Sequence, residues 1–240
     1  MIDIHCHILP GVDDGAGDMK TSLEMARIAE SNGTTAIIAT PHSNVPGIFD
    51  VDIELDFKAI VSQLNSELVA QGSKVKIYPG CEIFGAGDFL NLLKGGQLLT
   101  LNDSIYPLME FDFYEHPASV FVKLEQVLAQ GFVPIVAHPE RYLFVNEDCA
   151  SVEHLKDMGC LIQINKGSVT GKFGADAHRC AHEILVKGLA NFVASDAHSP
   201  VMRTPDMSDS YTTVCDLYSK QYADLLFKEN PARVLNNQKI

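Results

Sequence analysis

The chain has 240 residues, of which 46% are hydrophobic and 20% are charged, a composition typical of globular proteins. Its formal charge of -13, with only 18 lysines and arginines, argues against nucleic acid as a partner, because such proteins cluster basic residues against phosphates. No apolar run reaches the roughly 18 residues needed to span a bilayer, and the first residues lack a secretory signal pattern. We therefore expect a soluble cytoplasmic protein without membrane insertion, folded as one domain over residues 1–240.

Seven strand-like segments are predicted, each short and rich in β-branched or apolar residues. They are residues 1–8, 34–40, 74–78, 105–111, 133–138, 161–165 and 191–195. Between them, apolar side chains recur at helical spacing, as from Ile53 to Leu68 and from Val120 to Leu128. Helix ends are predicted where glycine follows a polar residue or methionine, at Asn32-Gly33, Gln71-Gly72, Gln130-Gly131 and Met158-Gly159.

The regular alternation of strands and helices defines the fold class. Such chains pair their strands in parallel through right-handed crossovers, which gives either a β/α barrel or an open doubly wound sheet. The chain contains no Gly-x-Gly-x-x-Gly and no P-loop sequence, so the nucleotide-binding versions of the open sheet are disfavoured.

Residue types that bind metals are concentrated where six of the predicted strands end. They are His5, His7, His42, Glu82, Glu110, His138, Asp196 and His198. In a barrel these ends meet on one face, where the catalytic loops lie. Asp14, on the loop after Gly11, can reach the same place. Because so many carboxylates and imidazoles in one cleft need cations to neutralise them, we predict a metal cluster here.

The spacing within two of these motifs supports convergence. Strand residues two apart point to the same side, so His5 and His7 can contact one region while Cys6 points into the wall. The same alternation predicts that Asp196 and His198 point together at the other end of the chain.

Two arginines, Arg141 in AHPERY and Arg203 in SDAHSPVMR, lie just beyond proposed ligands. A guanidinium offers a fork of donors that fits a tetrahedral oxyanion, so the pair favours a phosphate substrate over an amide or a lactone. Surface salt bridges are the alternative role for each.

Other candidates for chemistry are weaker. None of the six cysteines is followed six positions later by arginine, which excludes the phosphate loop of cysteine-dependent tyrosine phosphatases, and no Gly-x-Ser-x-Gly elbow occurs. His178 and His182 have i, i+4 spacing but lack the glutamate of the zinc-protease motif, and we expect them on a solvated helix face. His116 and His154 are also expected outside the site.

The motifs IDIHCHILPGVDDGA, TPH, GCEI, MEF, AHPERY and SDAH occur in this order. On these motifs, and over essentially its whole length, the chain resembles the polymerase-and-histidinol-phosphatase (PHP) superfamily. More closely, it resembles the manganese-dependent bacterial protein tyrosine phosphatases of the CpsB/CapC type, from capsule and exopolysaccharide loci. The resemblance implies a distorted (β/α)7 barrel with three divalent metal ions at its C-terminal face. Manganese is the metal it implies, while the ligand types suit iron or zinc equally.

The resemblance also implies how the ligands are shared among the metals. The first metal would take His5, His7, Glu82 and Asp196, the second Glu82, Glu110 and His138, and the third Asp14, His42 and His198. Arg141 and Arg203 correspond to arginines that hold the phosphate in the resembled enzymes.

The expected activity is hydrolysis of phosphotyrosine in a protein, through attack by a metal-bound hydroxide without a phosphoenzyme. The resemblance implies the tail of a bacterial tyrosine autokinase as the substrate. Ile48, Phe49, Tyr142 and Phe144 could form an apolar collar for the aryl group, or could simply pack within loops.

Other functions stay open. The first is a small-molecule phosphatase, such as one acting on histidinol phosphate. The second is a catalytically idle, metal-bound interaction module that docks on a kinase. A metal-dependent amidohydrolase is disfavoured, because no lysine at a predicted strand end except Lys166 occupies an obvious bridging position, and because the paired arginines favour phosphate.

Overall fold

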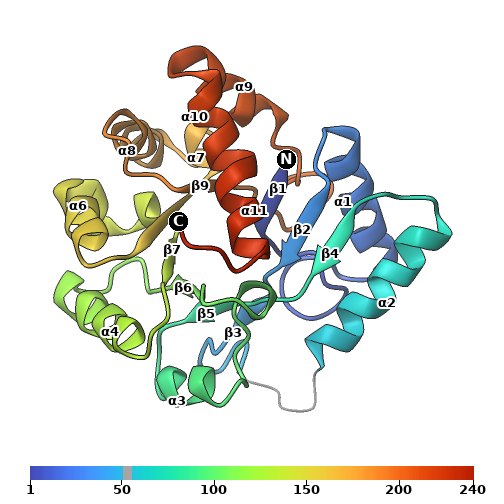
Figure 1. The fold of residues 1–240 in the computed structure, drawn as a ribbon, viewed down its shortest axis with the longest axis horizontal. Helices are drawn as coiled ribbons and strands as arrows, with labels where there is room; N and C mark the ends of the chain where they lie inside the picture. The colour runs from blue at the N-terminus through green and yellow to red at the C-terminus, as the bar shows by residue number, and fades with distance from the viewer. Residues whose placement is uncertain (51–55) are drawn as a thin grey trace.

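The computed structural model describes residues 1–50 and 56–240, and in this part of the chain short parallel strands are surrounded by helices (Figure 1). The strands are β1 (Ile2–Cys6), β2 (Ala36–Ala39), β3 (His42–Ser43), β4 (Lys76–Tyr78), β5 (Glu82–Phe84), β6 (Leu108–Glu110), β7 (Ile135–Ala137), β8 (Leu161–Asn165) and β9 (Phe192–Ala194). All seven predicted strands are present. Two further short strands, β3 and β5, were not predicted.

The strands form two hydrogen-bonded ladders, in the orders β1-β2-β4 and β3-β5-β6-β7-β8-β9. The two ladders are joined through the chain itself, since β3 follows β2 after Thr40 and Pro41, and β5 follows β4 after residues 79–81. Proline has no backbone N–H and cannot donate to a ladder. Pro41 and Pro79 therefore explain why β2 and β4 end where they do and why β3 and β5 follow as separate short strands.

The barrel is completed between its first and last strands. Cys6 forms an isolated parallel bridge with Ala197. The amide of Asp196 donates to the carbonyl of His5 at 2.8 Å, and the amide of His7 donates to the carbonyl of Ala197 at 2.9 Å. Because an open sheet would leave these two edges apart, the structure is the predicted distorted β/α barrel.

Helices cover the outside of the strands (Figure 1). They are α1 (Met19–Ser31), α2 (Phe57–Ala70), α3 (Phe89–Lys94), η1 (Leu101–Asp103), α4 (Pro117–Ala129), η2 (Pro139–Arg141), α5 (Leu143–Glu147), α6 (Ala150–Asp157), α7 (Lys166–Val169), α8 (Ala175–Val186), α9 (Ser208–Leu217), α10 (Lys220–Asp224), η3 (Leu225–Glu229) and α11 (Asn230–Leu235). Helices α1, α2, α4 and α6 end where the glycine pairs predicted. Ile53, which we assigned to the second helix, lies outside the described residues.

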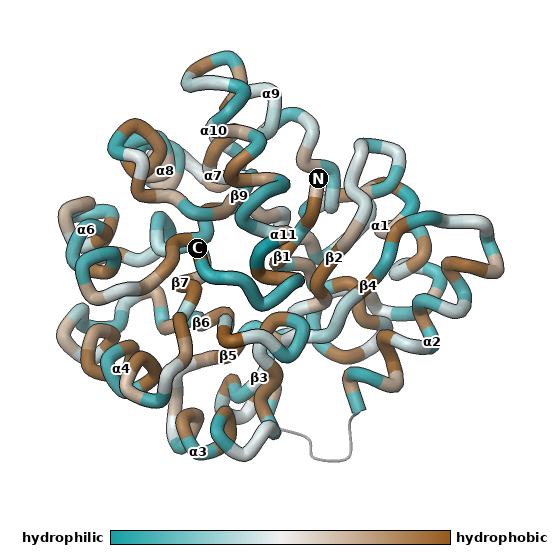
Figure 2. The backbone as a smooth tube through the Cα atoms, viewed as in Figure 1, coloured by the Kyte–Doolittle hydropathy of each residue, from teal (hydrophilic) through white to brown (hydrophobic). Residues whose placement is uncertain are grey.

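The hydrophobic core has an inner and an outer part. Ile4, Ile38, Leu108 and Ile135 belong to the cluster inside the barrel, while two larger clusters fill the space between strands and helices. Figure 2 shows the same distribution, with largely hydrophobic strands and helices of mixed character around them. No helix in the described part of the chain has the length and apolar character needed to cross a bilayer.

The C-terminal segment closes the end of the barrel opposite the predicted site. Helix α11 lies across the strands in Figure 1, and the carbonyl of Leu235 accepts a hydrogen bond from the Asn102 side chain at 3.0 Å. The hydroxyl of Tyr106 donates to the carbonyl of Gln238 at 2.7 Å. Asn102 and Tyr106 precede β6, so these bonds close the amino end of the strands and leave the carboxyl end for chemistry.

Candidate metal centre

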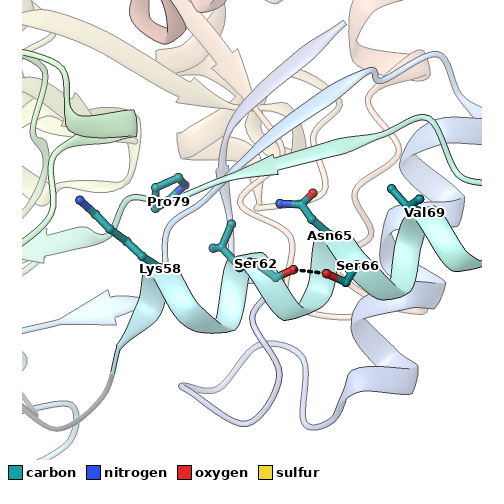
Figure 3. A pocket seen from close by; sticks show the side chains of 7 residues that line it. Lys58, Ser62, Asn65, Ser66, Val69 and Pro79 are labelled. Atoms are coloured by element: carbon teal, nitrogen blue, oxygen red, sulfur yellow. Dashed lines mark hydrogen bonds between the residues drawn. The ribbon is translucent and has the colours of Figure 1, made fainter.

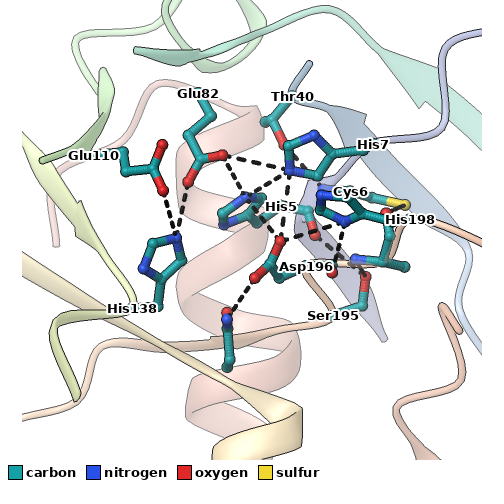
Figure 4. Close-up of polar contacts among 12 residues, drawn as sticks. His5, Cys6, His7, Thr40, Glu82, Glu110, His138, Ser195, Asp196 and His198 are labelled. Carbon is teal, nitrogen blue, oxygen red and sulfur yellow. Dashed lines mark hydrogen bonds and ion pairs between the residues drawn. The ribbon is translucent and has the colours of Figure 1, made fainter. Parts of the chain in front are cut away.

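The end of β1 brings two imidazoles together, with the Nε2 atoms of His5 and His7 3.2 Å apart (Figure 4). The pairing of β1 with β2 shifts register between Asp3 and Cys6. As a result Ile4 packs inside the barrel and Cys6 packs in the outer cluster, although residues two apart in a regular strand share a side. Burial raises the pKa of the Cys6 thiol well above its usual value, so Cys6 is a wall residue, as predicted.

The other nitrogen of each imidazole is held by a polar neighbour. His5 Nδ1 lies 2.9 Å from the amide oxygen of Gln163, and His7 Nδ1 lies 2.6 Å from Asp13 Oδ2. An amide oxygen and a carboxylate oxygen can only accept, so each Nδ1 carries the proton. In the neutral imidazoles both Nε2 atoms would present lone pairs to the same point, which is the orientation found in metal-binding histidines.

Glu82, the first residue of β5, lies at the centre of the site. Its Oε2 is 3.3 Å from His5 Nε2 and 3.4 Å from His7 Nε2. The same oxygen is 3.0 Å from His42 Nδ1, while Oε1 is 2.9 Å from His138 Nε2. The carboxylate thus contacts four imidazoles, from the ends of β1 and β7 and from β3, as a bridging ligand requires.

Glu110, at the end of β6, extends the cluster on one side. Its Oε2 is 3.5 Å from His42 Nδ1, and its Oε1 is 3.6 Å from His138 Nε2. Burial, together with the nearby negative charge of Glu82, raises the pKa of Glu110 to about 8. Two buried carboxylates so close together favour a cation between them.

The carboxyl end of β9 supplies Asp196 and His198, but not by strand alternation. The prediction of an i, i+2 strand pair is wrong here, because β9 ends at Ala194 and Asp196 has a left-handed backbone with φ of 49°. His138, directly after β7, also has a positive φ of 34°. This conformation raises the free energy of a non-glycine residue, and residues strained in this way cluster at functional sites.

Asp196 Oδ1 lies 3.5 Å from the Nε2 atoms of both His5 and His7. His198 Nδ1 is 3.1 Å from the backbone carbonyl of Asp196, so this nitrogen carries the proton and Nε2 is a free acceptor 3.5 Å from Asp14 Oδ1. The turn after β9 therefore orients both side chains toward the cluster.

Asp14 reaches the cluster because the loop after β1 folds back over His7. The amide of Ala16 donates to the carbonyl of His7 at 3.0 Å, and a Cβ on Gly15 would lie 2.1 Å from that same carbonyl oxygen. Only glycine fits this close approach. The loop places Asp14 Oδ1 3.7 Å from His42 Nε2, with its side chain 55% exposed.

All nine predicted ligands are thus brought to the carboxyl end of the barrel, in four overlapping groups whose ligand atoms lie within 4.8 Å of one another. The groups are His7-Asp14-His42-His198, His5-His7-Asp196, His5-Glu82-His138 and His42-Glu82-Glu110. They overlap more than the allocation implied by the resemblance, since His7 joins the outer group and His5 joins Glu82 and His138.

The donor set fits divalent metal ions. Among the described residues, three buried atoms that face the cluster have no hydrogen-bond partner, namely His42 Nδ1, Glu82 Oε2 and His198 Nε2, and the same is true of His138 Nδ1 on the other side of its ring. Buried polar atoms rarely stay unpaired, and imidazole nitrogens and carboxylate oxygens suit manganese, iron and zinc. The three unpaired atoms that face the cluster are therefore available to a metal ion.

Protonated histidines balance part of the negative charge of the carboxylates in the cluster. Burial lowers the pKa of His7, but hydrogen bonds to Asp13 and Asp196 outweigh it and hold that pKa well above the usual value. Burial would also raise the pKa of Asp196, yet the positive charges of His5 and Arg203 keep it well below its usual range. The cluster therefore holds cationic charge among its carboxylates, as it would with metals bound.

Both predicted arginines meet the cluster at Asp196. Arg203, in the turn after His198, places Nη2 2.5 Å from Asp196 Oδ2. Arg141, at the end of η2, places Nη1 3.5 Å from the same oxygen. One oxygen of the Asp196 carboxylate, Oδ1, therefore faces the imidazoles, while the other, Oδ2, contacts both guanidiniums.

Sequence reasoning missed the residues that support the ligands. Asp13 binds His7 and also accepts from the amide of His42 at 2.9 Å. Asn165 donates to Asp196 Oδ2 at 2.5 Å and accepts from the side chain of Gln163 at 2.9 Å. The Asp13-Asp14 pair was a signal for Asp13, whereas nothing in the sequence marks Gln163 or Asn165 beyond their place in a strand.

The apolar collar suggested by the sequence is not formed as a set of four residues. Tyr142 and Phe144 are buried and stack on each other with ring centroids 5.9 Å apart, so they belong to the core and form no collar. Of the other two, Ile48 is exposed and Phe49 stacks on His42 at 5.5 Å.

His178 and His182 are half-buried and anchor α8 to α7. His178 Nδ1 bonds the carbonyl of Ser168 at 3.0 Å, and His182 bonds Tyr218 and the carbonyl of Val169 at 2.6 and 3.2 Å. A solvated helix face was therefore the wrong expectation, although the pair stays apart from the site, as predicted.

A separate hollow lies between α2 and Pro79 (Figure 3). It is lined by Lys58, Val61, Ser62, Asn65, Ser66, Val69 and Pro79. Lys58 is its one ionisable residue and is paired with Asp103 at 2.8 Å. None of its residues belongs to the cluster, so it gives no second candidate for the chemistry.

The fold and site define a class of barrel proteins with clustered metal-ligating residue types at the carboxyl ends of parallel strands. Within that class, the chain belongs to the CpsB/CapC family of capsular polysaccharide synthesis, whose family model matches residues 1–236. The tyrosine-protein phosphatase YwqE of Bacillus subtilis is 36% identical over 240 residues, covering 100% of this chain and 93% of that protein.

Solved structures agree with this membership. A crystal structure from a study of YwqE of Bacillus subtilis and CpsB of Streptococcus pneumoniae, described as metal-dependent tyrosine phosphatases, has a TM-score of 0.93 and 36% identity. The structural match covers 100% of this chain and 96% of the chain in that crystal structure. A histidinol phosphate phosphatase of Lactococcus lactis, at 13% identity, has a TM-score of 0.59 over 94% of each chain, a likeness of fold alone.

Proposed function

We propose that this chain is a metal-dependent phosphomonoester hydrolase that removes phosphate from tyrosine residues of proteins, with residues 1–240 acting as one phosphatase domain. The observation that carries the proposal is the meeting of two arginines with a cluster of imidazoles and carboxylates at Asp196. Guanidiniums next to metal ligands suit a tetrahedral dianion better than an amide or lactone. The names of the family's phosphatases support the same activity.

Three divalent metal ions are part of the proposal, with manganese as the first choice and iron or zinc compatible with the ligands. The ligands we propose are His5, His7, Asp14, His42, Glu82, Glu110, His138, Asp196 and His198. When bound, the metals would activate water and neutralise charge on the phosphate. The support for this set is the four overlapping groups of ligand atoms, several of which are buried without a hydrogen-bond partner among the residues that the structure describes.

The residues of the chain have separate tasks in this mechanism. Asp13 and Gln163 fix the tautomers of His7 and His5. Arg141 and Arg203 bind the non-bridging oxygens of the phosphate and stabilise the charge that develops in the transition state. Cys6, the cysteine between the two ligand histidines, is buried with a raised pKa, which disfavours it as a nucleophile, and we propose direct hydrolysis without a phosphoenzyme.

The substrate we propose is a phosphotyrosine segment of a bacterial tyrosine kinase that acts in capsule or exopolysaccharide synthesis, in the cytoplasm. The family's role in capsular polysaccharide synthesis supports this assignment. The six cysteines are free, which suits a reducing compartment.

The first prediction tests the cluster itself. His138→Ala and Asp196→Asn should each lose at least one metal per chain, because each removes a ligand from the shared groups, and turnover of a phosphotyrosine peptide should fall about a hundredfold or more. Metal content is measured by elemental analysis and turnover by phosphate release on the same preparation. His154→Ala is the matched control, since His154 lies on α6 and packs against Phe121.

Wild-type metal content and activity in both variants would reject the assignment. The same assay distinguishes the remaining functions. Higher kcat/KM for histidinol phosphate than for the peptide would identify a small-molecule phosphatase. A fully metal-loaded chain that hydrolyses neither substrate would be an idle interaction module.

A further inference from the structure

Phe173 lies beside both arginines at the mouth of the barrel. The centre of its ring is 5.2 Å from Cζ of Arg141 and 5.7 Å from Cζ of Arg203, within the range of a cation–π interaction. We propose that Phe173 is a positioning residue, whose ring face holds the two guanidiniums side by side so that both can bind one phosphate. This inference rests on the proposed function, in which the arginines bind the phosphate.

The local sequence is built to deliver this ring to the arginines. Phe173 lies in the turn between α7 and α8, flanked by Gly171 with φ of 75° and Gly174 with φ of 95°. The ring packs on Gly167, where a Cβ would come within 2.9 Å of two ring atoms. The amide of Lys172 donates to the carbonyl of Gly167 at 2.7 Å and fixes the turn. Gly167 therefore makes room for the ring, while Gly171 and Gly174 form the turn that carries Phe173.

The arginines need such support because they share one anionic partner. Both contact Asp196 Oδ2, at 3.5 and 2.5 Å, while Oδ1 of that carboxylate faces His5 and His7. Two like charges that share one oxygen repel each other. The negative face of an aromatic ring offsets this repulsion without adding a competing carboxylate.

Arg203 depends on Phe173 more than Arg141 does. Arg141 has a second aromatic neighbour, Phe113, with its Cζ 4.5 Å from the ring centre. For Arg203, Phe173 is the one such ring in the part of the chain that the structure describes, and Nε of Arg203 is buried there without a hydrogen-bond partner. Loss of the ring should therefore free Arg203 first.

The test compares Phe173→Leu, which keeps an apolar side chain but removes the aromatic face, with Phe173→Tyr, which keeps it. In the metal-loaded full chain, Phe173→Leu should raise KM for p-nitrophenyl phosphate and the inhibition constant of inorganic phosphate, each by about fivefold to tenfold. Metal content should not change. Phe173→Tyr should stay within about twofold of wild type, because its ring offers the same face.

Two comparisons make the test specific. Phe121→Leu, on α4, removes an aromatic ring that packs against Phe144 and His154, and should leave both constants unchanged. An alkyl phosphomonoester should show the same loss as the aryl ester in Phe173→Leu, since the ring acts through the arginines. A loss confined to the aryl ester would overturn the proposal and make Phe173 a direct contact of the substrate.

The remaining outcomes are equally decisive. Wild-type constants in Phe173→Leu, or equal loss in the leucine and tyrosine variants, would overturn the positioning role. Arg141→Ala and Arg203→Ala, measured in parallel, separate this failure from that of the proposed function. If these two variants also bind phosphate like wild type, the arginines themselves have no role in phosphate binding.

Discussion

Gly15 controls the position of two acidic residues at the site. A Cβ at this position would lie 2.1 Å from the carbonyl oxygen of His7 and 2.5 Å from its Cβ, so Gly15→Ala must displace the loop that carries Asp13 and Asp14. We expect phosphatase activity to fall at least about tenfold through weaker metal binding, because Asp13 orients a ligand. Activity as a function of added manganese measures this effect.

Gly17→Ala provides the control in the same loop, because a Cβ there would meet no atom within 4 Å. It should respond to manganese as wild type does. Equal manganese dependence of the Gly15 variant and wild type would show that the loop tolerates the displacement.

At the scale of single residues, the sequence predicted the members of the cluster better than the residues that support them. Histidine and carboxylate at strand ends are rare enough in combination to be noticed, and all nine lie together in the structure. Gln163 and Asn165 act through hydrogen bonds that depend on the pairing of β8 with its neighbours. Such bonds have no local sequence pattern, so they could not be predicted from the chain.

Among the elements, α4 shows how the outer layer is held. Leu124 is fully buried in this helix, whereas Val122 is 52% exposed. Leu124→Ala should lower the free energy of unfolding by about 2–5 kcal/mol, because it leaves a cavity in the core. Val122→Ala on the same helix should change it by less than about 0.5 kcal/mol. Urea denaturation measures both, and similar losses would contradict the assigned burial.

The types of the elements could be predicted, but their interruptions could not. Helix ends at Gly33, Gly72, Gly131 and Gly159 have positive φ, as the helix-stop signal requires. The shift within β1 has no sequence signal, because it follows from pairing with β2. Likewise β9 ends before Asp196 because the chain turns there to meet β1, a tertiary contact that overrides local strand preference.

For the whole molecule, the metals should contribute to stability as well as to chemistry. Ligands that bind only the folded state add about 2.7 kcal/mol at a hundred times their Kd, which for a chain of this size raises Tm by about 5–10 °C. Removal of metal with EDTA should lower Tm by this amount and abolish activity, and manganese should restore both. Thermal unfolding followed by circular dichroism measures the shift.

His138→Ala is the control for this experiment, because a chain that lacks a ligand should show a smaller shift between EDTA and manganese. If EDTA leaves the Tm of the wild-type chain unchanged while activity is lost, the metals bind without stabilising the fold.

The bridge between Cys6 and Ala197 has a consequence for synthesis on the ribosome. The first histidines emerge early, but Asp196, His198 and Arg203 follow almost two hundred residues later, and they are needed to complete both the barrel and the cluster. A nascent chain therefore carries an unfinished set of ligands for most of its translation. The complete set of proposed ligands can form only after the last strand has left the exit tunnel and met the first, so we expect metal loading late in the maturation of this protein.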